Sequence, residues 1–215
     1  METRDGQLER GADMSYGYET EAIEWWKGEE GNLYTARNNP DEVQLRARRD
    51  LFEEILGRAQ LHREESVCEI GCNRGSNLRV LRRMGYNHLV GVEPNESARK
   101  KAIELCEVYE SINHIGVEPD LVFTCGVLIH VPPTELKETC LEIVELARTW
   151  VLAIEYFSDK PRMIEYRGTK DRLWSRDFGS FYLDNFPCLE PVACGFAWKP
   201  MTGLDNLTWT LLRKT

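Results

Sequence analysis

The sequence predicts an α/β fold: a mostly parallel sheet of seven strands, with helices on both faces, that ends in an antiparallel strand pair. Two observations predict this fold. Between residues 67 and 155, short apolar runs alternate with segments of helical periodicity, as in successive βαβ units. After residue 186, two further apolar runs follow each other with no helical segment between them, which indicates antiparallel pairing.

The first long helix is predicted to begin at Asn39 and to continue to Ala59. Asn39 can cap it, Pro40 suits the first helical position, and Glu42 stands where a capping box needs an acid. Apolar residues then recur at helical spacing, at Val43, Ala47, Leu51, Ile55 and Ala59. The arginines at positions 46, 48 and 49 lie mainly off this stripe, so they are expected to face solvent.

The alternation of apolar runs with helical periodicity predicts the remaining strands and helices. Strands are expected at residues 67–70, 88–93, 109–112, 121–128 and 150–155, and helices at 76–84, at 96–107 and from Pro133 onward. A polar loop leads to a helix at 175–185 and to the last two strands, at 192–198 and 207–212. Ligands of open α/β sheets bind at the carboxyl edge of the parallel strands, so the residues that follow these strands are the candidate site.

The turn from Glu69 to Leu78, between the first of these strands and its helix, is the main binding motif. Gly71 and Gly75 allow close approach of the backbone to a ligand, because glycine lacks a side chain and accepts positive φ. The spacing does not match GxGxxG, and GxxxxGK[ST] does not occur, which disfavours a nicotinamide dehydrogenase and excludes a P-loop. Glu69 is unfavourable for a pyrophosphate and favours a ligand with a cationic amino group.

A second acid follows the second strand. Glu93 comes 24 residues after Glu69, and a carboxylate at that strand end can accept hydrogen bonds from two ribose hydroxyls. Nicotinamide-binding proteins share this second acid but not the first. The two acids together indicate S-adenosylmethionine (SAM), which carries both a ribose and a cationic amino group.

Further motifs accompany this turn along almost the whole chain. They are Trp26-x-Gly28-Glu29-x-Gly31-x-x-Tyr34-Thr35-x-Arg37-Asn38, Gly71-x-Asn73-x-Gly75-x-Asn77-Leu78, Val122-Phe123-Thr124-x-Gly126-Val127-Leu128-Ile129-His130, Glu155-Tyr156, Tyr166-Arg167-Gly168-x-Lys170-Asp171-x-Leu173-x-x-Arg176-Asp177-Phe178 and Thr208-Trp209-x-Leu211-Leu212. The series resembles the class I SAM-dependent methyltransferases and, more narrowly, the methylases associated with pseudaminic acid biosynthesis. This resemblance implies a Rossmann-like class I methyltransferase fold that forms a single domain over residues 1–215.

The resemblance also implies which residues hold SAM and its product S-adenosylhomocysteine. They are Tyr34, Arg37, Asn38, Glu69, Gly71, Cys72, Asn73, Gly75, Asn77, Leu78, Glu93, Pro94, Ser111, Ile112, Thr124 and Cys125. The sequence departs from the family pattern at two places. Residues 110–114 stand where the adenine-contacting turn belongs and lack its usual acid, and Cys125 replaces a common lysine.

Candidate catalytic residues follow the fourth and fifth strands of the alternating region. His130 is the candidate base or acceptor-orienting group; the alternative is a histidine hydrogen-bonded to the backbone beside Pro132. Glu155 and Tyr156 are candidates on the same edge, and the alternative for both is capping of their strand.

The acceptor is expected to meet Trp26 and a basic set formed by Arg167, Lys170 and Arg176, which can hold a carboxylate or phosphate. The alternative is ion pairing of this set with Asp171 and Asp177. The aromatic N-terminal arm, residues 1–38, either packs on the domain or forms a lid over the site.

Composition excludes several other classes. The net charge of −9 argues against a duplex nucleic-acid surface, and no apolar run is long enough for a membrane span. The polar first 14 residues do not read as a secretory signal, and the seven cysteines include no CxxC pair, which predicts reduced thiols, a cytoplasmic location and no metal site. The sequence carries no feature that fixes an oligomeric state.

The predicted function is methyl transfer from SAM to a small polar metabolite, a sugar or nonulosonate of the pseudaminic acid type, with O-methylation preferred because a base is present. One alternative is an acceptor from natural-product metabolism. Another is a non-catalytic SAM-binding protein, which the intact turn disfavours.

Overall fold

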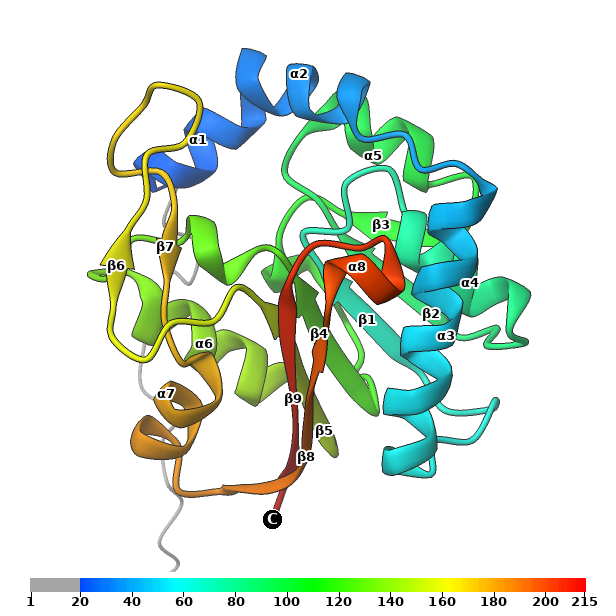
Figure 1. The fold of residues 1–215 in the computed structure, drawn as a ribbon. Helices are drawn as coiled ribbons and strands as arrows, with labels where there is room; N and C mark the ends of the chain where they lie inside the picture. The colour runs from blue at the N-terminus through cyan, green and yellow to red at the C-terminus, as the bar shows by residue number, and fades with distance from the viewer. Residues whose placement is uncertain (1–19) are drawn as a thin grey trace, which may run out of the picture.

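A seven-stranded sheet organises the computed structural model, which describes residues 20–215 (Figure 1). The strands are β1 (Val67–Ile70), β2 (Leu89–Val92), β3 (Glu107–Tyr109), β4 (Leu121–Cys125), β5 (Trp150–Glu155), β8 (Leu189–Ala197) and β9 (Leu207–Lys214). Their order across the sheet is β3-β2-β1-β4-β5-β9-β8. The first five strands pair in parallel, and β9 runs antiparallel to both of its neighbours. The predicted fold class is therefore confirmed.

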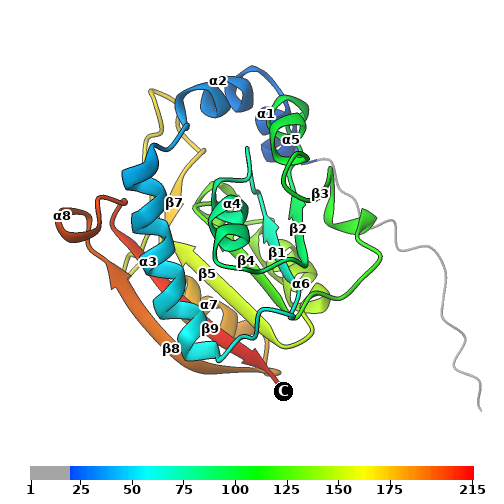
Figure 2. The same cartoon turned by 90° about the vertical axis from the view of Figure 1, so that its right-hand side faces the viewer.

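Helices cover both faces of this sheet (Figures 1 and 2). They are α1 (Glu21–Lys27), α2 (Glu29–Arg37), α3 (Glu42–Ala59), α4 (Ser76–Arg83), α5 (Glu96–Ala102), α6 (Leu136–Leu146), α7 (Phe178–Asn185) and α8 (Lys199–Thr202). Apolar residues of α3 and α4 join one core cluster, and those of α6 and α7 join a second cluster on the opposite face. A separate hairpin, β6 (Arg162–Met163) with β7 (Trp174–Ser175), stands between β5 and α7 in the chain.

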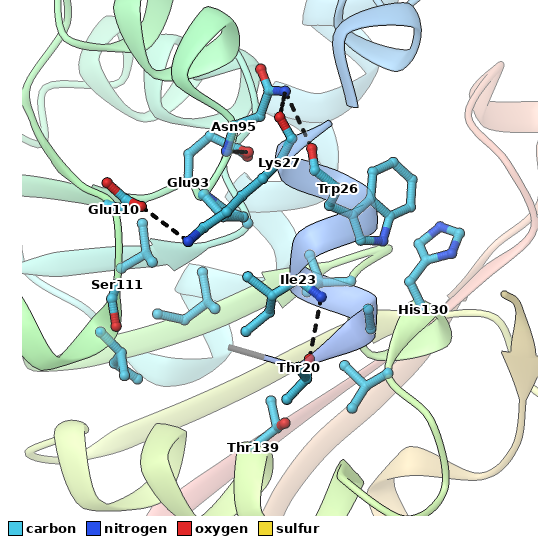
Figure 3. A pocket seen from close by; sticks show the side chains of 18 of the residues that line it. Thr20, Ile23, Trp26, Lys27, Glu93, Asn95, Glu110, Ser111, His130 and Thr139 are labelled. Atoms are coloured by element: carbon cyan, nitrogen blue, oxygen red, sulfur yellow. Dashed lines mark hydrogen bonds and ion pairs between the residues drawn. The ribbon is translucent and has the colours of Figure 1, made fainter. Parts of the chain in front are cut away.

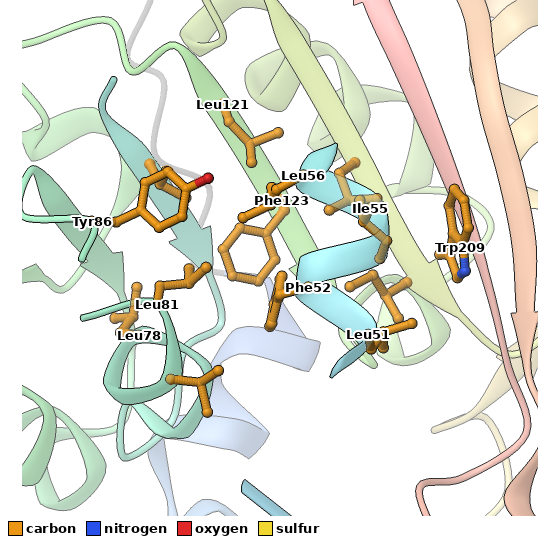
Figure 4. Close-up of a cluster of buried hydrophobic side chains, with 14 of the residues drawn as sticks. Leu51, Phe52, Ile55, Leu56, Leu78, Leu81, Tyr86, Leu121, Phe123 and Trp209 are labelled. Atoms are coloured by element: carbon orange, nitrogen blue, oxygen red, sulfur yellow. The ribbon is translucent and has the colours of Figure 1, made fainter. Parts of the chain in front are cut away.

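The predicted apolar stripe of α3 is buried at Leu51, Ile55 and Ala59, whereas Val43 at its start is 63% exposed (Figure 4). Phe52 and Ile55 are almost completely buried, and the ring of Phe52 meets that of Phe123 on β4 edge to face, with centroids 5.4 Å apart. Leu78 and Leu81 of α4 complete the layer. This packing fixes α3 and α4 over the strands whose ends carry the candidate site.

Parallel register brings the candidate motifs to one edge. Ile70 pairs with Val92 and with Thr124, so the residues after β1, β2 and β4 emerge side by side. The helices α1 and α2 lie over this edge (Figures 1 and 2). The segment between β6 and β7 contacts α1, where the ring centroids of Tyr166 and Trp25 are 6.2 Å apart.

Two expectations about the N-terminal half were wrong. The helix expected from Asn39 begins at Glu42, because Asp41 forms the capping box instead: its carboxylate accepts from the Gln44 amide, and the Gln44 side chain accepts from the Asp41 amide. No helix was predicted in the aromatic arm before it, but residues 20–38 of this arm contain the two helices α1 and α2. The first 19 residues of the predicted arm lie outside the described residues.

The strand expected at 121–128 ends early, at Cys125. Gly126 has φ +68, which turns the chain, and the amides of Val127 and Leu128 then donate to the Glu155 carboxylate rather than to a strand. The turn directs residues 126–130 across the edge of the sheet. No helix within residues 20–215 combines the length and the apolar character that a membrane crossing requires.

Candidate functional site

A cavity of about 450 Å³ opens at the carboxyl edge of the sheet, under α1 and α2 (Figure 3). Its walls come from the turn after β1, the end of β2, the loop after β3, the segment after β4 and the start of α6. Among the residues that line it are Trp26, Tyr34, Gly71, Asn73, Glu93, Pro94, Ser111, Ile112, Cys125 and His130. The structure thus brings together predicted residues from five separate segments of the chain.

The turn after β1 depends on backbone that only certain residues adopt easily. Gly71 has φ +70, and a Cβ there would lie 2.6 Å from Cγ2 of Val127, so a side chain is excluded on steric grounds as well. Asn73 also has positive φ, and its amide donates to Glu93 Oε2 at 2.7 Å. The turn is therefore fastened to the end of β2.

Glu93 is a buried carboxyl group on the cavity wall, with 6% of its surface exposed. Each of its oxygens accepts one backbone N–H, from Asn73 at 2.7 Å and from Asn95 at 2.8 Å. A carboxylate oxygen has further acceptor capacity, so both can still bind ligand hydroxyls. Burial raises the pKa of Glu93 to about 7, although these two hydrogen bonds lower it.

Glu69 lies behind the cavity wall rather than on it. Its Oε1 accepts from Asn77 Nδ2 at 2.6 Å, and Asn77 Oδ1 accepts from Arg48 Nη1 at 2.8 Å. Burial raises the pKa of Glu69 to about 8, although Asn77 and Arg48 both lower it. The expectation that Arg48 faces solvent was wrong: its Nε is buried, and its Nη1 donates to Asn77 in the first turn of α4.

The loop after β3 supplies the wall opposite the glycine turn. Ser111 caps a short 3-10 helix, Ile112–His114, and both Ser111 and Ile112 line the cavity together with Pro94. On the α6 side the wall is formed by Glu135, Thr139 and Glu142, which the sequence reasoning missed. These side chains add two carboxyl groups and a hydroxyl group to the α6 side of the cavity.

His130 lines the cavity and is also hydrogen-bonded to the backbone, but the partner is the Arg172 carbonyl oxygen and not the backbone beside Pro132. Its Nδ1 lies 2.7 Å from the Arg172 carbonyl oxygen, which can only accept, so Nδ1 carries the proton and Nε2 is left as an acceptor. Burial lowers the pKa of His130 to about 4. The imidazole is therefore neutral at pH 7 and holds a lone pair on Nε2.

Aromatic rings surround this histidine. Trp26 lies 4.7 Å from His130 and 5.3 Å from Tyr34, and Tyr166 lies 5.1 Å from His130, all as edge contacts between ring centroids. Trp25 contacts both Trp26 and Tyr166. We call Trp25, Trp26, Tyr34, His130 and Tyr166 the aromatic cluster. Burial raises the pKa of Tyr34 to about 12 and that of the neighbouring Cys125 to about 12, so these two groups are neutral near pH 7.

Glu155 and Tyr156 do not line this cavity. Glu155 Oε1 accepts from the amides of Val127 and Leu128, both at 3.2 Å, which holds the segment that carries His130. The Tyr156 hydroxyl donates to Asp205 at 3.1 Å. Glu155 thus binds the segment after β4 and does not cap its own strand, β5.

Several further candidates for cofactor binding have structural contacts instead of a place on the cavity wall. Cys72, Leu78 and Thr124 are buried, and Gly75 is the N-cap of α4 with φ +76. Arg37 donates to Glu30 and to Tyr166, and Asn38 ends α2 by donating to the Tyr34 carbonyl.

The predicted basic set does not gather at the cavity. Arg167 and Lys170 are exposed on the hairpin tip, and Arg176 lies over the Phe181 ring in a separate small hollow with Glu155. The alternative is not observed either, since within residues 20–215 no ion pair joins these three to Asp171 or Asp177. Asp177 instead caps α7.

Asn95 fastens the covering helices to the sheet, and the sequence reasoning missed it. Its Nδ2 lies 3.2 Å from the carbonyl oxygens of Trp26 and Lys27 and 3.1 Å from Asn32 Oδ1 (Figure 3). Thr35 adds a second link by accepting from Asn73 Nδ2 at 2.8 Å. The only sequence signal was the position of Asn95 two residues after Glu93.

The free energy of unfolding of the ligand-free protein is expected to fall as pH rises from about 5 to 8. Burial gives Glu69, Glu93 and Glu155 folded pKa values of about 8, 7 and 7, above the ordinary 4.5, so the folded state keeps protons that the unfolded state has lost. Each such proton is worth about 1.4 kcal/mol per pH unit. Below pH 6.5, His130 has the opposite effect on the free energy of unfolding. Its folded pKa is lowered, so the unfolded state binds a proton there that the folded state does not.

Urea denaturation at half-unit pH steps measures this slope, and Glu155→Gln should flatten it. A free energy of unfolding that rises steadily over this range would contradict the assigned protonation states.

Comparison with known proteins adds two findings. A family profile described as a methyltransferase domain matches residues 42–161. A search of curated proteins gave no match.

Solved structures of similar fold have low sequence identity. Magnesium protoporphyrin IX methyltransferase from Synechocystis PCC 6803, with bound SAH, superposes with a TM-score of 0.67 at 13% identity, covering 90% of this chain and 97% of that one. The 1,6-didemethyltoxoflavin-N1-methyltransferase of Burkholderia thailandensis, with its substrate and S-adenosylhomocysteine, gives 0.64 at 16% identity, covering 90% and 85%. The mitomycin 7-O-methyltransferase MmcR gives 0.63 at 13% identity, covering 90% and 60%.

Proposed function

The chain belongs to the methyltransferase-domain family, and from this membership we propose that it binds SAM and transfers the methyl group to a small polar molecule. The observation that carries the proposal is the cavity wall, where the glycine turn, Glu93 and the Ser111–Ile112 loop meet at the carboxyl edge of the sheet. The structural neighbours with bound SAM or SAH support the same cofactor.

The residues present fit SAM on three counts. The cavity of about 450 Å³ is in the usual range for a cofactor site. Glu93 offers both carboxyl oxygens to a ribose. At the glycine turn, Glu69 Oε2, Asn73 Oδ1 and Arg48 Nε are buried without a hydrogen-bond partner among residues 20–215. Of these three atoms, Asn73 Oδ1 is on the cavity wall and would accept from an ammonium of the ligand, whereas Glu69 and Arg48 lie behind the wall.

The proposed mechanism is direct displacement, for which SAM supplies an electrophilic methyl group on its sulfonium. The chain's task is mainly to hold the reactants in line, which can lower the barrier by up to about 7–11 kcal/mol. His130 Nε2 orients the acceptor hydroxyl and takes its proton, while the Arg172 carbonyl fixes the tautomer that leaves Nε2 free. Glu155 holds the segment on which His130 stands.

We propose a hydroxyl of a sugar acceptor of the nonulosonate type as the methyl acceptor. The neutral histidine beside the cavity supports O-methylation, and the sequence resemblance described above supports the sugar. The helices α1 and α2 are proposed to act as a lid, because polar contacts through Asn95 and Thr35 hold them over the cavity.

One observation favours a second candidate. The aromatic cluster presents ring faces and edges around His130, which suits a planar heteroaromatic acceptor as well as a sugar ring. Natural-product intermediates of that kind are therefore the alternative acceptor class.

Incubation with methyl-labelled SAM, read by mass spectrometry, separates the two. The panel contains nonulosonates, their nucleotide-activated forms and planar heteroaromatic phenols, with Glu93→Ala protein as the control for enzyme-dependent transfer. We expect label on a nonulosonate hydroxyl. Label on the heteroaromatic compounds alone would contradict the sugar assignment and favour the second candidate.

A further inference from the structure

Arg172 lies next to the proposed base but was not among the predicted site residues. Its carbonyl oxygen accepts from His130 Nδ1, and its guanidinium lies 5.4 Å from the centre of the Trp25 ring. The side chain is 19% exposed. Arg172 therefore flanks the aromatic cluster on the Nδ1 side of His130, and it is not among the residues that line the cavity.

The guanidinium of Arg172 is only partly used. Its Nη2 pairs with Glu21 Oε1 at 2.5 Å, whereas its Nε is buried and has no hydrogen-bond partner in the described part of the chain. Nε and Nη2 form one edge of the guanidinium fork, which matches the two oxygens of a carboxylate. One carboxylate placed along this edge would satisfy both nitrogens.

Glu21 is a weak occupant of that edge. Its side chain is 82% exposed and makes a single contact, and exposed ion pairs contribute about 0–1 kcal/mol. It also belongs to α1, the helix that places Trp25 and Trp26 in the aromatic cluster. A competing carboxylate can replace it at little energetic cost.

We infer that Arg172 is the carboxylate-binding residue of the acceptor site, and that Glu21 holds part of its place in the ligand-free protein. The inference rests on the proposed function, because it assigns the acceptor class: a small molecule that bears a carboxylate near the methylated hydroxyl. Neither Arg37, which binds Glu30 and Tyr166, nor Arg176, which lies in a separate hollow, offers an open edge at this place.

Acceptor binding at Arg172 would also affect the helix α1. When the carboxylate of the acceptor takes the place of Glu21 at Arg172, the ion pair between Glu21 and Arg172 breaks. Within residues 20–215, it is the one ion pair that joins α1 to the chain segment before β7. Binding of the acceptor is thereby coupled to the position of α1.

The test is a titration with acetate, followed through the arginine Nε–Hε signals in nitrogen–proton NMR spectra of protein saturated with S-adenosylhomocysteine. Arg172→Met identifies the signal by its loss and leaves the carbonyl contact to His130 intact. We expect the Arg172 signal to shift and to saturate at millimolar acetate. Glu21→Gln should bind acetate at least about threefold more tightly, because the competing carboxylate is gone.

Arg162 is the matched control, since it is an exposed arginine of the adjacent hairpin, paired with Asp159 at 3.0 Å. We expect the Arg162 signal to shift without saturating. The inference is overturned if the Arg172 signal does not shift with acetate, or if it also shifts without saturating. The same spectra report S-adenosylhomocysteine binding through the backbone amide signals of the cavity, so failure of the proposed function is read separately.

Discussion

Replacing Glu93 with alanine is expected to weaken S-adenosylhomocysteine binding by about 100-fold or more. A hydrogen bond to a charged group contributes about 1.5–3 kcal/mol, and the carboxylate is placed to accept two from a ribose. The substitution also frees the amides of Asn73 and Asn95, which both donate to Glu93 and hold the glycine turn in place. Isothermal titration calorimetry measures the change.

Glu96→Ala is the matched control for this substitution. Glu96 follows Glu93 closely but is exposed and paired with Lys100, so its removal should leave the affinity unchanged. Glu93→Gln, which keeps one acceptor oxygen, should fall between the two. If Glu93→Ala bound S-adenosylhomocysteine as tightly as the unaltered protein, the ribose assignment would have to be abandoned.

Replacing His130 with alanine is expected to lower turnover by about 100-fold while cofactor affinity stays near normal. General-base groups contribute typically 10²–10⁴-fold, and the lowered pKa of about 4 makes His130 a weak base, which places it at the low end. Turnover and affinity are measured separately, by single-turnover methyl transfer and by calorimetry. His62→Ala, which alters an exposed histidine away from the cavity, is the control.

The pH profile of the unaltered enzyme adds an independent check on His130. Because the folded pKa is lowered, the imidazole stays unprotonated from pH 8 to about 5, so its contribution should be constant over that range. A loss of activity centred near pH 6.5 and absent in His130→Ala would show a normally titrating histidine and contradict the buried geometry.

The parallel part of the fold was predictable because its signals are local. The runs 67–70 and 150–155 are strands at the predicted bounds, since apolar β-formers between turns have few alternatives. Glu93 was predictable for a related reason: a strand that pairs in register with β1 must deliver its last residue to the same edge. The cofactor half of the site follows from these elements.

Other contacts around the cavity were less predictable because they join distant segments of the chain. Helical periodicity indicated that Arg48 lies off the apolar stripe, but it does not say which way a long side chain bends, and the partner Asn77 is 29 residues away. Arg172 donates to Glu21, which lies 151 residues earlier in the chain. The helices α1 and α2 carry few apolar residues in a regular stripe, and their place depends on Asn95 from another part of the chain.

The central claim is that this cavity binds an aminoacyl nucleoside and not a dinucleotide. The most direct measurement is calorimetric titration of the unaltered protein with S-adenosylhomocysteine and, separately, with NAD. We expect one S-adenosylhomocysteine per chain and no heat of binding with NAD. Binding of NAD without binding of S-adenosylhomocysteine would contradict the account.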